Sequence, residues 1–184
     1  GLIEVTNPSE LFLAERAAGT PGSAVTATVE GTRPLLVEVQ ALLSPIAYGA
    51  GRRTSEGFDH NRLALLLAIL ERRGGLNVAA NDVFVNVVGG VRLDEPAVDL
   101  AVAAALASSL LDKPLPEGAA FFGELGLGGE IRSVTAADLR VKEAAAIGMS
   151  SVYLPGGNAR KLGKNNGIEL KTAKNISQFL RMLF

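Results

Sequence analysis

The sequence predicts a single domain of the α/β (α+β) class, in which helices pack against a mixed sheet. Two observations support this prediction. Segments with the alternating pattern of strands are interspersed with segments that have the apolar spacing of helices, from an early hairpin to a final helix. The 184 residues are 48% hydrophobic and 20% charged, which is enough for one core of ordinary size. No internal repeat or linker divides the chain, so we assign residues 1–184 to one domain.

The first half of the chain predicts a short helix, a β-hairpin, a long loop and a second helix. Asn7 followed by Pro8 favours a helix start, because asparagine caps the first N–H groups and proline fits the first turn. Two β-branched segments of alternating polarity flank Gly31, which predicts the hairpin. Asp59 or Asn61 caps the second helix. The predicted ranges are a helix over 7–16, strands over 23–30 and 33–42, a loop over 44–60, and a helix over 61–73.

The second half predicts four helices that alternate with short strands. Residues 82–88 are mainly apolar and β-branched, which is typical of a buried strand, and two glycines end it. Repeated alanines in residues 96–111 indicate a helix that packs closely against its neighbours. Gly128-Gly129 predicts a tight turn that leads into another short strand. The remaining predicted ranges are strands over 119–124, 151–154 and 168–170, and helices over 135–147, 158–163 and 175–184.

The composition excludes several classes of site. The sequence contains no cysteine and one histidine, which excludes disulfides, thiolate metal sites and sites that need two histidines. We therefore expect no metal site and no cofactor in this chain. A net charge of −1 argues against a surface built throughout to coat nucleic acid or an anionic membrane. The longest apolar stretch, residues 96–111, is too short to span a bilayer, so we expect a cytoplasmic protein without a membrane partner.

The region from residue 82 to residue 154 carries an ordered set of motifs. A buried strand, a Gly-Gly pair and a helix of small residues precede the hairpin Gly-Glu-Leu-Gly-Leu-Gly-Gly-Glu-Ile of residues 123–131. This order resembles the proteolytic domain of the Lon family and implies the Lon proteolytic-domain-like fold. In that family a serine nucleophile opens the helix and a lysine general base follows the hairpin. Here the serine position is Ala97, and the lysine position falls at or near Asp138.

The resemblance therefore implies a pseudo-protease. A Ser–Lys dyad needs a hydroxyl group to attack and a neutral amine to accept its proton, and neither Ala97 nor Asp138 supplies them. Ser108 and Ser109 lie about three turns further along the helix, too far to replace the nucleophile. We expect no catalytic residue in this chain and therefore no enzyme activity of its own. The alternative is an active Lon-type serine peptidase with a nucleophile that the sequence does not reveal.

A narrower resemblance covers nearly the whole chain. Residues 7–13, 30–42, 61–67 and 82–92 are similar to the Lon-like C-terminal domain of the RadA (Sms) family of bacterial DNA repair proteins. Members of that family add a zinc finger and a RecA-like ATPase, and neither has a signature here, so the resemblance implies a fragment. The full-length protein would be a DNA-dependent ATPase. ATP, magnesium and zinc are expected only in the missing domains.

The same resemblance implies a role in recombination and DNA damage repair. Proteins of this type form rings, expected to be hexamers, that move on single- or double-stranded DNA and extend strand exchange by branch migration. This domain would serve as ring scaffold and DNA-contacting module, and a recombinase is a further expected partner. Arg62, at a helix start, is a candidate donor of an ion pair between subunits. A purely structural oligomerisation domain stays open as an alternative.

The charge distribution suggests where DNA would be contacted. Residues 1–120 hold 9 basic and 14 acidic side chains, whereas residues 121–184 hold 9 basic and 5 acidic ones. A local surplus of positive charge is typical of a solvated basic face, and the functional interpretation is an electrostatic contact for an anionic partner. The Arg52-Arg53 pair in the expected glycine-rich loop could contact DNA or another subunit, or serve only solubility. The candidate DNA-contacting residues are Arg52, Arg53, Arg160, Lys161, Lys164, Lys171 and Lys174.

Overall fold

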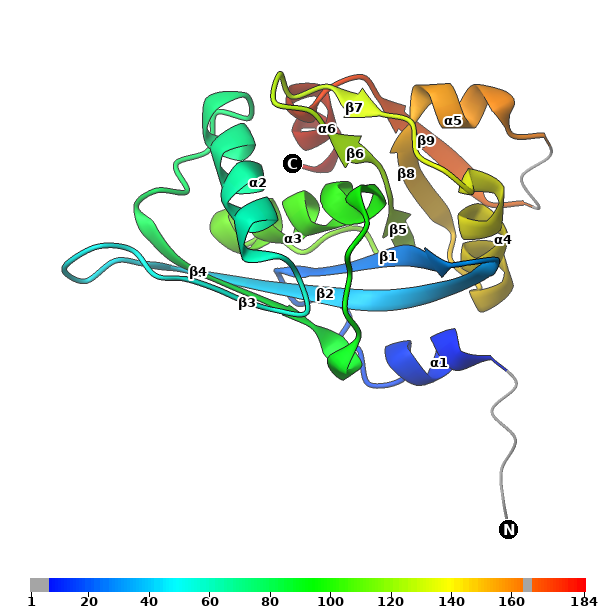
Figure 1. Cartoon of the computed structure of the whole chain (residues 1–184), viewed down its shortest axis with the longest axis horizontal. Coiled ribbons are helices and arrows are strands. Elements are labelled where there is room, and N and C mark those ends of the chain that lie inside the picture. Colours follow the sequence, from blue (N-terminus) through cyan, green and yellow to red (C-terminus); the bar gives the residue numbers. More distant parts are fainter. Residues whose placement is uncertain (1–6, 164–166) are drawn as a thin grey trace, which may run out of the picture.

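A computed structural model describes residues 7–163 and 167–184, and Figure 1 shows how its elements are arranged. Its strands are β1 (Ser23–Glu30), β2 (Arg33–Pro45), β3 (Arg53–Glu56), β4 (Asn81–Val87), β5 (Ala119–Phe121), β6 (Glu124–Leu125), β7 (Ile131–Arg132), β8 (Ser151–Pro155) and β9 (Glu169–Ala173). Seven of them form one sheet in the order β3-β4-β2-β1-β5-β8-β9, and β6 pairs separately with β7. The sheet contains parallel and antiparallel neighbours, so the predicted mixed sheet with packed helices is confirmed.

The helices cover both faces of this sheet. They are α1 (Pro8–Leu13), α2 (His60–Arg72), α3 (Asp99–Leu111), α4 (Ala137–Ile147), α5 (Gly156–Lys161) and α6 (Ile176–Leu183), with short 3₁₀ turns η1 (Val88–Gly90) and η2 (Pro96–Val98). Figure 1 shows α2 and α3 above the β1–β2 hairpin and α1 below it. The part of the chain that the structure describes contains no helix long and apolar enough to cross a membrane.

Each face of the sheet has its own hydrophobic core, because successive side chains of a strand point to opposite faces. Ala24 of β1 packs in the larger cluster, with α2, α3 and α6. Its neighbours Val25 and Ala27 pack in the smaller cluster, with α4. The predicted hairpin is confirmed: β1 and β2 pair in register from Ser23–Gln40 to Glu30–Arg33.

Helix α3 runs through the larger core and is buried almost all round. Ten of its 13 residues are buried, and most of them are alanine, valine or leucine. Its start is tied to the end of β5, because the Gly123 N–H donates to the Ala97 carbonyl at 2.7 Å. The Leu100 N–H donates to the Gly123 carbonyl at 3.1 Å. The predicted helix over 96–111 is confirmed, with its first three residues forming the 3₁₀ turn η2.

The loop predicted over residues 44–60 is wrong in two places. β2 continues to Pro45, and residues 53–56 form the edge strand β3, which pairs in parallel with β4. The register runs from Arg53 opposite Val83 to Glu56 opposite Asn86. Arg-Thr-Ser-Glu carries no apolar alternation, so its strand character comes from the hydrogen-bond ladder that β4 offers and not from its own composition.

Other predicted boundaries also differ from the structure. The strand predicted over 119–124 is divided into β5 and β6, because the chain turns at Gly123 to bond with Ala97. β9 extends to Ala173, three residues beyond the predicted strand. The helix predicted over 158–163 begins earlier, directly after β8. These differences move boundaries without changing the order of the elements.

Candidate functional site

A pocket of about 810 Å³ lies between η2 and the segment that leads from β7 into α4. Ala97 and Asp138 both line it. The positions that the resemblance assigns to the serine and lysine of the Lon family therefore face one pocket, although they are far apart in the sequence. Ala97 is 4% exposed and presents a methyl group, and Asp138 is an exposed carboxylate.

The same pocket contains side chains that the sequence analysis did not single out. Ser133 and Thr135 line it, beside Lys161 of α5, which is one of the candidate DNA-contacting residues. The hydroxyl oxygen of Ser133 lies against Gly157, where any side chain would collide with it. Both hydroxyl residues belong to the irregular segment between β7 and α4, and no motif in the sequence marks them.

A partly buried ion pair lines this pocket. Arg140 of α4 is 1% exposed, and its Nη1 donates to the Glu95 carboxylate. The same nitrogen donates to the Ala27 carbonyl at 2.6 Å, and Nε donates to the Thr135 carbonyl at 3.1 Å. The guanidinium also lies 5.9 Å from the centroid of the Phe122 ring. Because Glu95 precedes Pro-Ala97 directly, the pair connects α4 to the segment that would carry a nucleophile in a Lon-type enzyme.

A second ion pair lies beside the first turn of α3. Asp99 is completely buried, and Arg62 of α2 donates to it from Nε at 2.9 Å and also from Nη2. The Leu125 N–H donates to the same carboxylate at 3.0 Å. Burial raises the pKa of Asp99, and the hydrogen bonds from Arg62 and Leu125 oppose that rise. The ion pair that Arg62 forms lies within its own chain, and its predicted role between subunits stays a prediction.

The C-terminal cations lie around α5 and β9. Arg160 and Lys174 line a second pocket of about 340 Å³, whereas Lys161 lines the larger one. Lys171 of β9 is directed at Tyr153, with its Nζ 5.5 Å from the ring centroid. Lys164 lies outside the described residues. The structure therefore brings Arg160 and Lys174 together and holds Lys171 on the aromatic ring of the next strand.

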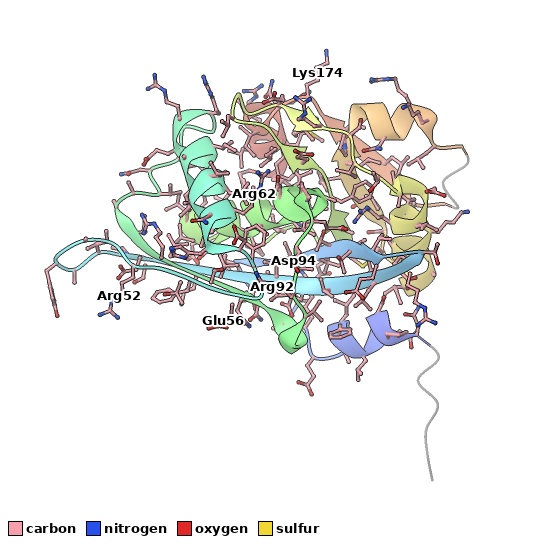
Figure 2. The ribbon with its side chains drawn as sticks, in the orientation of Figure 1. Arg52, Glu56, Arg62, Arg92, Asp94 and Lys174 are labelled. Atoms are coloured by element: carbon pink, nitrogen blue, oxygen red, sulfur yellow. The ribbon has the colours of Figure 1, made fainter. Side chains whose placement is uncertain are left out.

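The other two candidates lie at the sheet edge. The backbone N–H of Arg52 donates to Asp82 at 2.7 Å, and Figure 2 shows the Arg52 side chain far from Lys174. Arg53 folds onto the backbone, and its Nη1 donates to the Asn81 carbonyl at 2.6 Å. These two arginines do not share a surface with the C-terminal cations. Their role in contacting DNA stays a prediction.

Over residues 7–163 and 167–184, no three histidine, aspartate or glutamate side chains converge as a metal site would require. His60 is the first residue of α2 and lies beside Asp59, which caps that helix by accepting from the Arg62 N–H.

Comparison with known proteins gives two findings. A family model described as subunit ChlI of Mg-chelatase matches residues 60–158, which include both ion pairs. The chain is also 50% identical over 181 residues to the DNA repair protein RadA of Bacillus subtilis (strain 168), which covers 98% of this chain and 40% of the relative.

Other relatives give the same result. RadA of Listeria monocytogenes is 52% identical over 176 residues, covering 96% of this chain and 37% of the relative. RadA of Streptococcus pneumoniae is 46% identical over 184 residues, covering 100% of this chain and 44% of the relative. The chain thus spans about two fifths of the length of the curated relatives it matches. It belongs to the ChlI family, and its resemblance to the bacterial DNA repair protein RadA is confirmed over its whole length.

Proposed function

We propose that this chain is the non-catalytic, Lon-like domain of a RadA-type DNA repair protein. It serves as the scaffold of a ring, hexameric by resemblance, and as a surface that contacts DNA during ATP-driven branch migration in the cytoplasm. ATP, magnesium and zinc belong to other domains of the full-length protein. The observation that carries the non-catalytic role is that Ala97 and Asp138 line the same pocket. Neither position supplies the hydroxyl or the amine that a Ser–Lys dyad needs.

The ion pair at this pocket supports the same role. In a Ser–Lys mechanism the amine must be neutral and within hydrogen-bond reach of the hydroxyl. Here the chain next to Ala97 is occupied by the Glu95 carboxylate and its buried partner Arg140. These two groups form an ion pair with each other, and they do not supply the hydroxyl nucleophile and neutral amine base of a Ser–Lys dyad.

A peptidase assay tests the non-catalytic role. Casein and fluorogenic peptides incubated with the chain should stay intact at neutral pH. The variants Ser133→Ala and Thr135→Ala should give the same result as the unaltered chain, since both hydroxyls line the pocket without a catalytic role. Cleavage that disappears in either variant would support the alternative of an active serine peptidase.

A binding experiment tests the DNA-contacting role. The affinity of the chain for single- and double-stranded DNA should be measured across a salt series, with the oligomeric state measured in the same samples by light scattering. We expect affinity to fall steeply as salt rises, because cations that neutralise phosphates release condensed counterions. A monomer that binds no DNA at low salt contradicts both parts of the proposal.

A further inference from the structure

The smaller pocket near the C-terminus has the chemistry of an anion site. It lies where β8 and β9, two parallel neighbours in the sheet, reach their carboxyl ends. In sheets of this kind, ligands bind in the crevice outside the carboxyl ends of the strands. The pocket of about 340 Å³ is lined by Ile131, Gly156, Gly157, Arg160, Thr172, Ala173, Lys174 and Gln178.

The charged residues in this lining are both cations. Arg160 comes from α5 and Lys174 follows β9, and both are exposed to solvent. Four other pockets of the molecule each have at least one aspartate or glutamate in their lining. The pocket of Arg160 and Lys174 therefore presents positive charge, and its lining contains no carboxylate that would compete with an anionic ligand.

The acidic residue on the adjacent hairpin is directed elsewhere. Glu130 lies next to Ile131 in the chain, and it forms a bridge with Asn175 through the backbone. Its carboxylate accepts from the Gly128 N–H at 3.0 Å and from Arg132 at 3.3 Å. The Glu130 carboxylate is thus bonded within its own hairpin and does not neutralise Arg160 or Lys174.

Gly156 lies against the Arg160 guanidinium, whereas the close neighbour of Gly157 is the Ser133 hydroxyl. A Cβ atom at Gly156 would lie 3.3 Å from Nη1 of Arg160, and one at Gly157 would lie 3.8 Å from Nη2. Gly156 is not among the glycines with positive φ, so the backbone conformation does not require glycine there. The absence of a side chain instead lets the guanidinium lie across the chain at the mouth of the pocket.

We propose that this pocket binds a phosphate group, and that the phosphate belongs to the backbone of a nucleic acid. Arg160 offers the planar pair of N–H donors that suits two phosphate oxygens, Lys174 adds a second positive charge, and the Thr172 hydroxyl supplies a neutral donor. The choice of nucleic acid rests on the proposed function above. The pocket would then be part of the surface by which this domain holds DNA.

Charge-removing variants test the site. Arg160→Gln and Lys174→Gln should each weaken DNA binding roughly five- to tenfold at low salt and reduce the slope of log affinity against log salt by about one. Arg181→Gln is the matched control, because Arg181 is an exposed arginine of α6 whose Nη1 bonds Ser177 outside the pocket. If the three variants lose affinity equally, the pocket is not the binding site, even though DNA contact itself stands.

A second pair of variants keeps every charge. Gly156→Val places a side chain where the Arg160 guanidinium lies, so it should weaken DNA binding nearly as much as Arg160→Gln. Gly163→Val is the control, because a Cβ at Gly163 meets nothing within 4 Å. Thermal unfolding of all variants checks that the fold is retained. Equal affinities of the two valine variants would overturn the role of the Arg160 position.

Titration with inorganic phosphate tests the phosphate site independently of the proposed role in DNA binding. Titration of the chain with phosphate, followed by NMR of the Gly156 and Gly157 amides, should shift both signals in the unaltered chain and neither in the Arg160→Gln, Lys174→Gln double variant. Shifts without any DNA binding would identify a site for free phosphate and overturn its assignment to nucleic acid. Shifts that persist in the double variant, or no shifts at all, would overturn the site.

Discussion

Asp99 and Arg140 show how this small domain keeps charges inside its core. They are 0% and 1% exposed, and each is bonded to an oppositely charged partner as well as to backbone groups. Removing one member of such a pair leaves the other buried without compensation, which costs far more than the pair contributes to stability. Glu95 and Arg140 line the pocket at Ala97, and Asp99 lies two residues further along the chain.

Replacing Asp99 should therefore be strongly destabilising. In Asp99→Ala the Leu125 N–H loses its acceptor and the Arg62 guanidinium keeps only the Leu125 carbonyl, so we expect a loss of about 3 kcal/mol in the free energy of unfolding. Asp94→Ala is the control, because Asp94 pairs with Arg92 on the surface, with side chains 66% and 62% exposed, and it should cost less than about 1 kcal/mol. Urea unfolding of both variants measures the difference, and equal losses would contradict the role of burial.

The protonation of Asp99 should also affect stability. Burial raises its pKa above that of an ordinary aspartate, so the folded chain binds a proton more readily than the unfolded chain. The contribution of this group to the free energy of unfolding should then fall as pH rises from the ordinary aspartate range through the raised pKa. Carbon NMR of the Asp99 carboxyl group measures that pKa. In Arg62→Gln the pKa should rise further, because hydrogen bonds that lower it are lost; a fall would contradict this account.

At the scale of elements, local sequence pattern predicts most of the fold but not the edge strand β3. The hairpin, α2 and α3 have strong periodicity, and their predicted ranges match the structure closely. β3 has no such pattern and becomes a strand only because β4 offers it backbone partners. The division between β5 and β6 similarly depends on the bond between Gly123 and Ala97, which no local pattern encodes.

Helix α3 should tolerate little added volume. Ala104 is completely buried in the larger core, so Ala104→Leu has to displace its neighbours and should cost about 2 kcal/mol of unfolding free energy. The control is Ala146→Leu, at an exposed position of α4, which should change stability by less than about 0.5 kcal/mol. Thermal unfolding compares the two variants, and an unchanged stability of Ala104→Leu would show that α3 packs loosely.

At the scale of the whole molecule, one apolar region of the sheet is open to solvent. Leu42 of β2 and Phe84 of β4 are 61% and 36% exposed, and both line a groove of about 500 Å³ on the sheet. Exposed apolar side chains that lie together favour contact with another protein surface. This groove supports the proposed role in assembly.

Charges introduced into this groove should reduce self-association. Leu42→Glu and Phe84→Glu add a carboxylate to a surface that would become buried on assembly, so the mass measured by sedimentation velocity should fall. Leu127→Glu is the control, since Leu127 is 69% exposed at the tip of the β6–β7 hairpin. If all three variants assemble like the unaltered chain, the groove is not an assembly surface.

The sequence by itself determined the class of fold, the order of most elements and the similarity to the RadA proteins. These depend on periodicity and on long runs of identical residues, which are local properties of the chain. Through the resemblance it also predicts that Ala97 and Asp138 stand at the serine and lysine positions of the Lon family, and the structure places both on one pocket. Only the tertiary structure decided which charges meet, as in the pairs that Asp99 and Arg140 form and the pocket that Arg160 shares with Lys174. The physical reason is that such contacts join residues far apart in the chain. The local sequence pattern around a charged residue does not indicate which distant residue will be its partner.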